Sequence, residues 1–312
     1  MNAQASEGDA PVGVFVGLAT LDVIHRVSAA PAPNEKITSS AQFVAAGGPA
    51  ANAAVTFSAL GGTAVLVTAL GDDPVAELVK ADLAAFGVRV LDAALGTRRS
   101  VPVSAVTVIE STGDRSVVSA DAVHSEVPPP EDLETVVADA DVVLVDGHHP
   151  LIACAAAEHA AARVTTLVVD AGRWKPVMSE LIPHATDMVC SADFRAPGTS
   201  DTATTAAALV AAGVHTVVTT HGSEPVEWWT AGSSGSVDVE PVTAVDTVGA
   251  GDAFHGAYAY YSTQPGSLAE RIDSSARVAA LRCSVIGPRA WLHELSADTL
   301  TNDGLESGNG EH

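Results

Sequence analysis

Nine residues near the C-terminal end of the chain, Asp246-Thr-Val-Gly-Ala-Gly-Asp-Ala-Phe254, limit its fold and chemistry more than any other stretch. The small residues Gly249, Ala250 and Gly251 let a ligand approach the backbone closely, and a mostly apolar helix is predicted to follow them. Free N–H groups at the start of that helix would bind an anion, with the carboxylate of Asp252 in the first turn. This arrangement fits transfer of a phosphoryl group to a hydroxyl whose proton Asp252 accepts. On spacing alone, a glycine turn capped by an ordinary Asp is the alternative.

A second motif, Gly47-Gly-Pro-Ala-Ala-Asn-Ala-Ala54, stands about two hundred residues earlier. The two motifs, in this order, closely resemble the two signatures of the ribokinase-like (PfkB) carbohydrate kinase family, and the resemblance covers nearly the whole chain. It implies an ATP-dependent sugar kinase in which Asp252 is the base and N–H groups of residues 249–251 stabilise the transferring group. It also implies that the sugar is held by Asp22, Gly47, Gly48 and Asn52.

The composition excludes several other classes of protein. A net charge of −23 argues against binding nucleic acid or an anionic membrane surface. The polar N-terminus is not typical of a signal peptide, and no apolar run is long enough to span a membrane. Cys154, Cys190 and Cys283 are widely spaced among apolar neighbours, which is typical of buried free thiols in the cytoplasm.

The order of apolar runs predicts one α/β domain over residues 11–300, with a doubly wound, mainly parallel sheet flanked by helices. Runs such as Val12–Leu18 and Ala64–Leu70 are typical of buried parallel strands, and strands and helices alternate regularly from Pro128 onward. Two hairpins interrupt the alternation, at about 22–46 and 98–121, and the first is expected to pair strands over Val23–Val27 and Lys36–Ala45. One or two helices are expected over Ser267–Ile286. The resemblance implies that they form a small β-sheet lid over the sugar, which also joins two subunits in a homodimer. Residues 1–10 and 301–312 are expected to be disordered tails.

Polar side chains follow several predicted strands, where open α/β sheets place their ligands. Asp22 comes after the first strand, although a turn-forming Asp is the alternative. His148 and His149 follow another strand; adjacent residues point apart, so we favour sugar contact by His148 over a metal site. Arg173 and Lys175 follow the next strand, and one of them could reach the phosphates, with a surface salt bridge as the alternative.

Further residues are assigned only by the resemblance. Thr220 and Gly222 match an element that contacts nucleotide phosphates, although Pro225 follows where a glycine is usual. Asp246 and Thr247 are placed in the same cofactor site. Arg115 and Arg289 could each hold an anionic group of the sugar, or could be surface arginines.

Two departures from the family pattern concern metal ions. An Asn-x-x-Glu motif linked to magnesium is replaced by Ser191 and Phe194, with Asp193 one position away. Mg²⁺ is expected with ATP, either contacted through water by Asp193 or held without that carboxylate. Val248 stands where Thr is frequent, which leaves a monovalent-cation site open.

The departures resemble ketohexokinase-type and sulfofructose-kinase-type members more than true ribokinases. They predict phosphorylation of a primary hydroxyl of a ketose or ketose derivative. A nucleoside or ribose kinase of the same fold is one alternative, which the 4% aromatic content mildly disfavours. A non-catalytic sugar-binding sensor is another. A dinucleotide oxidoreductase or a P-loop NTPase would require glycine motifs that the chain lacks.

Overall fold

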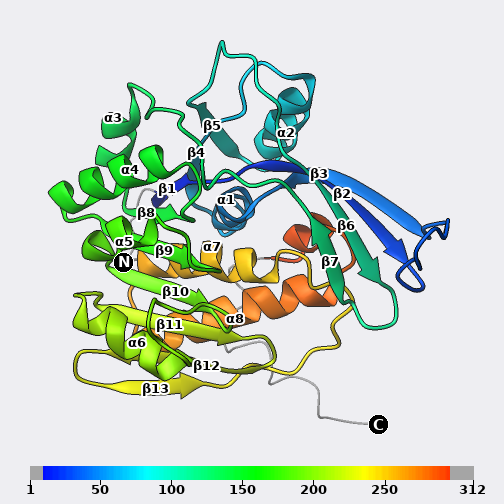
Figure 1. The fold of residues 1–312 in the computed structure, drawn as a ribbon. Helices are drawn as coiled ribbons and strands as arrows, with labels where there is room; N and C mark the ends of the chain where they lie inside the picture. Colours follow the sequence, from blue (N-terminus) through cyan, green and yellow to red (C-terminus); the bar gives the residue numbers. More distant parts are fainter. Residues whose placement is uncertain (1–9, 296–312) are drawn as a thin grey trace, which may run out of the picture.

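The computed structural model describes residues 10–295, so nearly all of both predicted tails lies outside the described residues. The main sheet has nine strands in the order β13-β12-β11-β10-β9-β8-β1-β4-β5 (Figure 1). Its strands are β1 (Val12–Val16), β4 (Thr63–Thr68), β5 (Val88–Asp92), β8 (Val142–Val145), β9 (Thr166–Ala171), β10 (Asp187–Ser191), β11 (Thr216–His221), β12 (Glu224–Thr230) and β13 (Ser234–Val237). All neighbouring strands are parallel except for β12 and β13, which pair antiparallel at one edge. The predicted doubly wound sheet is confirmed.

The strand order reverses between β1 and β8, because β4 and β5 extend the sheet on one side of β1 and β8 to β11 extend it on the other. Crevices outside the carboxyl ends of strands at such a reversal are where open α/β sheets bind ligands. The fold therefore directs attention to the segments that follow β1, β8 and β9.

Helices cover both faces of the sheet and divide the apolar core in two. One core lies under α1 (Pro49–Ala59), α2 (Pro74–Ala85), α7 (Ala250–Ser262) and α8 (Leu268–Ser284). The other lies under α3 (Leu133–Ala138), α4 (Pro150–Arg163), α5 (Met178–Leu181) and α6 (Thr202–Ala211). Alternate residues of one strand enter opposite cores, as Phe15 and Val16 of β1 do, because side chains alternate across a strand. No helix among the described residues has both the length and the apolar content needed to cross a membrane.

The second sheet has four strands in the order β3-β2-β6-β7 and projects from the main body (Figure 1). Its strands are β2 (Thr20–Val27), β3 (Ala41–Gly47), β6 (Val103–Ile109) and β7 (Arg115–Val118). The two predicted hairpins join through a parallel pairing of β2 with β6, with Asp22 opposite Ser104. We call this sheet the lid.

Several predicted boundaries were wrong. The strand expected over Lys36–Ala45 begins only at Ala41, since residues 33–40 form turns and irregular structure. Asp22 lies within β2 rather than in a turn after β1. By contrast, the helical prediction over 267–286 is confirmed: the segment is the single helix α8, which begins at a capping box formed by Ser267 and Glu270. The three cysteines are free, but only Cys190 is fully buried.

Candidate active site

The start of α7 carries N–H groups that no other part of the described chain uses. Gly249, at φ 72°, precedes the helix, and no described acceptor bonds to the backbone N–H of Gly249, Gly251 or Asp252. The N–H of Ala250, also predicted for this site, instead lies 3.4 Å from the carbonyl oxygen of Thr247. A Cβ added at Gly251 would meet nothing within 4 Å, so the space above this turn is open. Three free donors and the positive end of a helix therefore face an open space, which is the arrangement expected of an anion site.

The carboxylate of Asp252 is held beside these donors by the second motif. Asn52, in the first turns of α1, donates from Nδ2 to Asp252 Oδ2 at 2.8 Å. Arg289 donates to the other end of the same amide, with its NH1 3.2 Å from Asn52 Oδ1. Because a guanidinium can only donate, this contact fixes the orientation in which the amide nitrogen faces Asp252.

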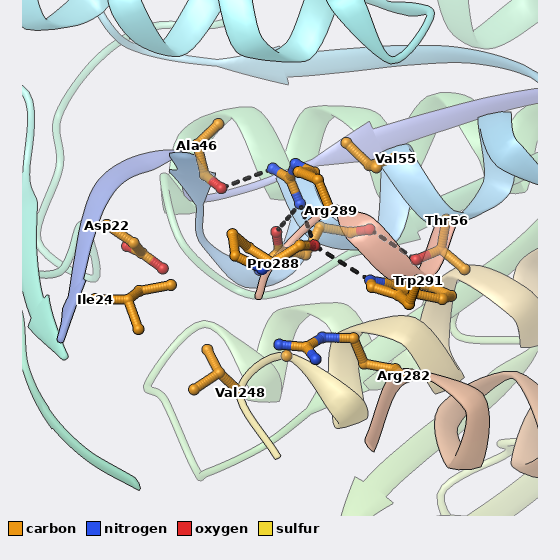
Figure 2. A pocket seen from close by; sticks show the side chains of 12 residues that line it. Asp22, Ile24, Ala46, Val55, Thr56, Val248, Arg282, Pro288, Arg289 and Trp291 are labelled. Atoms are coloured by element: carbon orange, nitrogen blue, oxygen red, sulfur yellow. Dashed lines mark hydrogen bonds between the residues drawn. The ribbon is translucent and has the colours of Figure 1, made fainter. Parts of the chain in front are cut away.

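Arg289 is itself held firmly. Its Nε and NH2 lie 3.2 and 2.9 Å from Asp82 Oδ2 of α2, and NH2 donates to the carbonyl of Ala46 at 2.7 Å. Figure 2 shows Arg289 between Ala46 and Pro288, beside a cavity of ≈ 20 Å³ that Asp22 and Asn52 also line. Asp82, Arg289, Asn52 and Asp252 thus form one chain of contacts.

The pKa of Asp252 is raised to about 6: burial is the largest cause, and the nearby carboxylate of Asp170, at the end of β9, acts in the same direction, whereas the hydrogen bond from Asn52 opposes both effects. His255, one turn further along α7, contacts both sides of this region: its Nδ1 is 2.7 Å from the carbonyl oxygen of Gly251, and its Nε2 is 3.5 Å from Asp170 Oδ1. Carboxyl groups with a pKa near working pH suit proton acceptance from a hydroxyl.

Asp22 and the glycine pair meet at the base of the lid. The Asp22 carboxylate lies so close to Gly47 that an added Cβ would stand 2.1 Å from Oδ2, and Thr20 Oγ1 donates to Oδ1 at 2.6 Å. Gly48 adopts φ 97°, and a Cβ there would lie 2.3 Å from the carbonyl oxygen of Leu18. Gly48 therefore requires glycine, and a larger residue at Gly47 would displace the Asp22 carboxylate. The structure brings Asp22, Gly47, Gly48, Asn52 and Asp252 to one region.

We call residues 245–249, which lead into α7, the signature loop. Asp246, predicted at the cofactor site, is buried near the start of this loop. Its carboxylate accepts from the N–H groups of Val248 (3.1 Å) and Gly287 (2.9 Å). Arg282 of α8, also buried, places NH2 3.3 Å from Asp246 Oδ1 and donates from NH1 to the carbonyl of Val285 at 3.0 Å. A buried carboxylate needs such compensation, so this pair holds the loop that leads into α7.

The lid contacts the same loop. Arg26 of β2 donates to the carbonyl of Val245 at 2.8 Å, and Gly113, in the β6–β7 turn, accepts from Thr247 Oγ1 at 2.9 Å. Arg115 donates to the same hydroxyl at 3.2 Å. Thr247 and Arg115, predicted to contact cofactor and sugar, thus join the lid to the signature loop.

His148 lies at the point where the strand order reverses. Its Nδ1 is 3.1 Å from Asp146 Oδ1, and the same carboxylate accepts from the N–H groups of Leu18 and Ala50. The Asp146 pKa is held well below its ordinary range, because the neighbouring His148 and Lys175 outweigh the opposing effect of burial. Lys175 is itself buried and donates to the carbonyl of Asp146 at 2.7 Å.

The segments that follow β9, β10 and β11 lie on the side predicted for the nucleotide. Arg173 forms an ion pair with Asp121, the surface-salt-bridge alternative considered above. Gly222 is exposed, with nothing within 4 Å of an added Cβ, whereas Thr220 is partly buried and lies opposite Ser191 in the sheet. In this conformation, Arg173 is engaged by a carboxylate while the backbone around Gly222 is open.

Phe194, in the position of the family's glutamate, is a core residue that packs near Trp174, and Asp193 is exposed beside it. No group of three or more His, Cys, Asp or Glu side chains within residues 10–295 could hold a metal on its own. Mg²⁺ is commonly held by one or two carboxylates together with substrate phosphates and water, and the exposed Asp193 fits that mode of binding.

Comparison with known proteins agrees with this geometry. Residues 13–294 match the model of the pfkB family carbohydrate kinases. A ribokinase from Staphylococcus aureus is 23% identical over 291 residues, covering 89% of this chain and 95% of that protein. Among solved structures, a ribokinase candidate from Agrobacterium tumefaciens has a TM-score of 0.80 at 26% identity and covers 91% of this chain and 94% of its own. An Arabidopsis thaliana ribokinase complexed with ribose and ATP has a TM-score of 0.73 at 22% identity, covering 89% and 94%.

The chain belongs to the pfkB family of carbohydrate kinases, and is an ATP-dependent sugar kinase. Sequence reasoning did not find the contacts made by Arg282, Asp82 and Arg26. The polar pairs that these residues form join segments distant in the sequence, and no local pattern indicates them.

Proposed function

We propose that the protein transfers the γ-phosphoryl group of ATP to a primary hydroxyl of a ketose or ketose derivative. The observation that carries the proposal is the placing of the Asp252 carboxylate beside three free N–H groups at the start of α7. In this mechanism, Asp252 takes the hydroxyl proton as the oxygen attacks the γ-phosphorus. The N–H groups of Gly249, Gly251 and Asp252 stabilise negative charge on the transferring group.

The sugar is held by Asp22, the Gly47–Gly48 backbone and Asn52, and His148 is the further residue proposed to contact it. Mg²⁺ bound with ATP would neutralise charge on the phosphates, and Asp193 is the exposed carboxylate that would contact it through water; the alternative is that the metal is held without this carboxylate. Thr220 and Gly222 lie along the path of the nucleotide.

Ribose is the second candidate substrate, because the relatives above include ribokinases and the family model does not separate pentoses from ketohexoses. The test is ATP consumption with Mg²⁺ across fructose, tagatose, ribose, 6-deoxy-6-sulfofructose, 2-keto-3-deoxygluconate, adenosine and inosine. A ketose or ketose derivative should give the highest kcat/KM. Preference for ribose or a nucleoside would overturn the ketose assignment, and sugar binding without turnover would indicate a sensor.

The base is tested separately with Asp252→Asn. Loss of general-base catalysis alone should lower kcat by roughly 10²–10⁴-fold, and lost positioning adds to this. Turnover within a few-fold of the unmodified enzyme would show that Asp252 is not the base.

We also propose a homodimer that pairs the outer faces of two lids. Strand pairing places Val44, Val103 and Val118 on the face opposite Asp22, with exposed fractions of 53%, 47% and 76%. Such an apolar stripe on an exposed sheet favours association with a second copy. Light scattering should give a dimer that Val118→Lys dissociates, and a monomeric unmodified protein would refute the proposal.

A further inference from the structure

A second cavity, of ≈ 370 Å³, lies under the root of the lid. Its floor is formed at the carboxyl ends of β1 and β4, by Leu18 and Ala69 among others. Its walls are the segment that enters the lid, at 99–103, and the segment that leaves it, at 120–122. Cavities of this size are typical of small-molecule sites.

The cavity adjoins the sugar site through a shared wall. Leu18 and Ala19, which line it, lie directly against Gly48, since a Cβ added at Gly48 would be 2.3 Å from the Leu18 carbonyl oxygen and 3.1 Å from Ala19 Cα. His149, on the opposite wall, follows His148. The cavity therefore lies directly beside the region in which the glycine pair would hold the sugar.

Arg99 lines this cavity with a guanidinium that has no partner. No hydrogen bond or ion pair joins it to any residue between 10 and 295. Its aliphatic stem lies against Gly71, since a Cβ added there would be 2.8 Å from Arg99 Cγ. In a chain with 38 acidic and 15 basic residues, an unpaired and partly buried arginine is unusual. Other cations of this chain have carboxylate partners, among them Arg173, Arg271, Arg282, Arg289 and Lys80.

The other polar groups of the cavity leave it positive. The carboxylate of Asp121 is already paired with Arg173 outside the cavity. Burial lowers the pKa of His149 to about 4, so its ring is uncharged at neutral pH, with Nδ1 3.0 Å from Ser125 Oγ. Arg99 is therefore a charged group of the cavity lining that has no counter-ion.

We propose that the sugar substrate carries an anionic group, a carboxylate, sulfonate or phosphate, and that Arg99 binds this group in the cavity under the lid. The anionic group sits at the end of the sugar remote from the hydroxyl that receives the phosphoryl group. Arginine presents paired donors that match the oxygens of all three groups. The inference rests on the proposed sugar-kinase reaction and names its substrate class.

The test compares pairs of sugars that differ at one end, where one member carries an anionic group and the other a neutral hydroxyl or hydroxymethyl group. One pair is 6-deoxy-6-sulfofructose with fructose, and another is 2-keto-3-deoxygluconate with 3-deoxyfructose. For at least one pair, the unmodified enzyme should have a kcat/KM at least about 100-fold higher for the anionic sugar. Arg99→Met should remove 10-fold or more of this preference, through KM for the anionic sugar, and leave the neutral sugar unchanged. Arg99→Lys should recover part of it, and Arg98→Met, at the exposed neighbouring arginine, should change neither sugar.

Two results would overturn the inference. One is an equal loss for the charged and neutral sugars in Arg99→Met, and the other is a preference of the unmodified enzyme for neutral sugars. Calorimetry with the Asp252→Asn variant separates this inference from the reaction itself: binding of the anionic sugar that Arg99→Met abolishes supports it even without turnover. Inorganic sulfate that binds at Arg99 without displacing the anionic sugar would show instead a separate anion site, and would refute it.

Discussion

The pH dependence of turnover follows from the pKa of Asp252, which its neighbour Asp170 raises and its neighbour Asn52 lowers. The base must be ionised to accept a proton, and its pKa is raised to about 6, first by burial and then by Asp170. With saturating sugar and MgATP, kcat should therefore fall tenfold per pH unit below about pH 6. Asn52→Leu removes a 2.8 Å hydrogen bond to the carboxylate. A hydrogen bond to a charged group is worth about 1.5–3 kcal/mol, so this acid limb should move up by about 1–2 pH units.

Asp170→Asn should move the same limb down, by about one pH unit, because it removes a negative charge that disfavours ionised Asp252. The assay measures ADP directly from pH 5 to pH 9, with circular dichroism to show that each variant is folded. Asp132→Asn, an exposed carboxylate on another part of the surface, is the control and should leave the profile unchanged. Shifts of both variants in the same direction, or an acid limb that neither moves, would refute the assignment of this limb to Asp252.

Three further outcomes follow from the same contacts. Asp252→Asn should raise the free energy of unfolding at pH 8 by about 1–3 kcal/mol, because a carboxyl group whose pKa is raised on folding lowers stability once it is ionised. Denaturant titration measures this gain, which should disappear below about pH 4, where the carboxyl group is protonated in both the folded and the unfolded state. Arg289→Met leaves the side-chain amide of Asn52 free to rotate and should lower kcat about tenfold, and Arg289→Lys should recover part of this loss. Equal kcat values in the two variants would contradict the proposal that Arg289 orients the Asn52 amide. The monovalent-cation site was left open at Val248, whose N–H bonds to the Asp246 carboxylate, and Arg282 already supplies the positive charge beside that carboxylate. Replacing K⁺ by Na⁺ or choline should therefore change the rate less than twofold, and strong K⁺ activation would contradict this reasoning.

Much of the main domain could be predicted from the sequence because its signals are local. Buried parallel strands are short apolar runs, and the strands from β8 to β11 alternate with helices in the order that the sequence indicates. The lid was harder to predict. Its central pairing joins β2 to β6, which are about eighty residues apart, and the position of each strand depends on that pairing rather than on a turn. The start of β3 was therefore misplaced even though the hairpin was found.

The site divides in the same way. Asp252, Asn52 and Asp22 belong to recognisable motifs, and the fold brings all three together. Their supports come from elsewhere: Arg289 follows α8 and Asp82 belongs to α2. A polar residue on a helix does not reveal its partner until the helices have docked, so sequence reasoning could treat Arg289 only as a ligand of the sugar or as a surface residue.

The contacts made by the arginines and lysines bear on which groups attract ATP. In a chain of net charge −23, binding of a polyanion has to depend on local groups, and the sequence predicts two kinds: the free N–H groups at the start of a helix, and one of the scarce cations Arg173 and Lys175. Several cations of the chain instead stabilise the protein itself: Arg26 and Arg282 hold the signature loop, and Lys175 is bound to a backbone carbonyl. The free N–H groups at the start of α7 remain, and they need no charged side chain that a neighbouring carboxylate could neutralise. An acidic protein can therefore keep a phosphate site, because its cations fix the loop and the loop presents the donors.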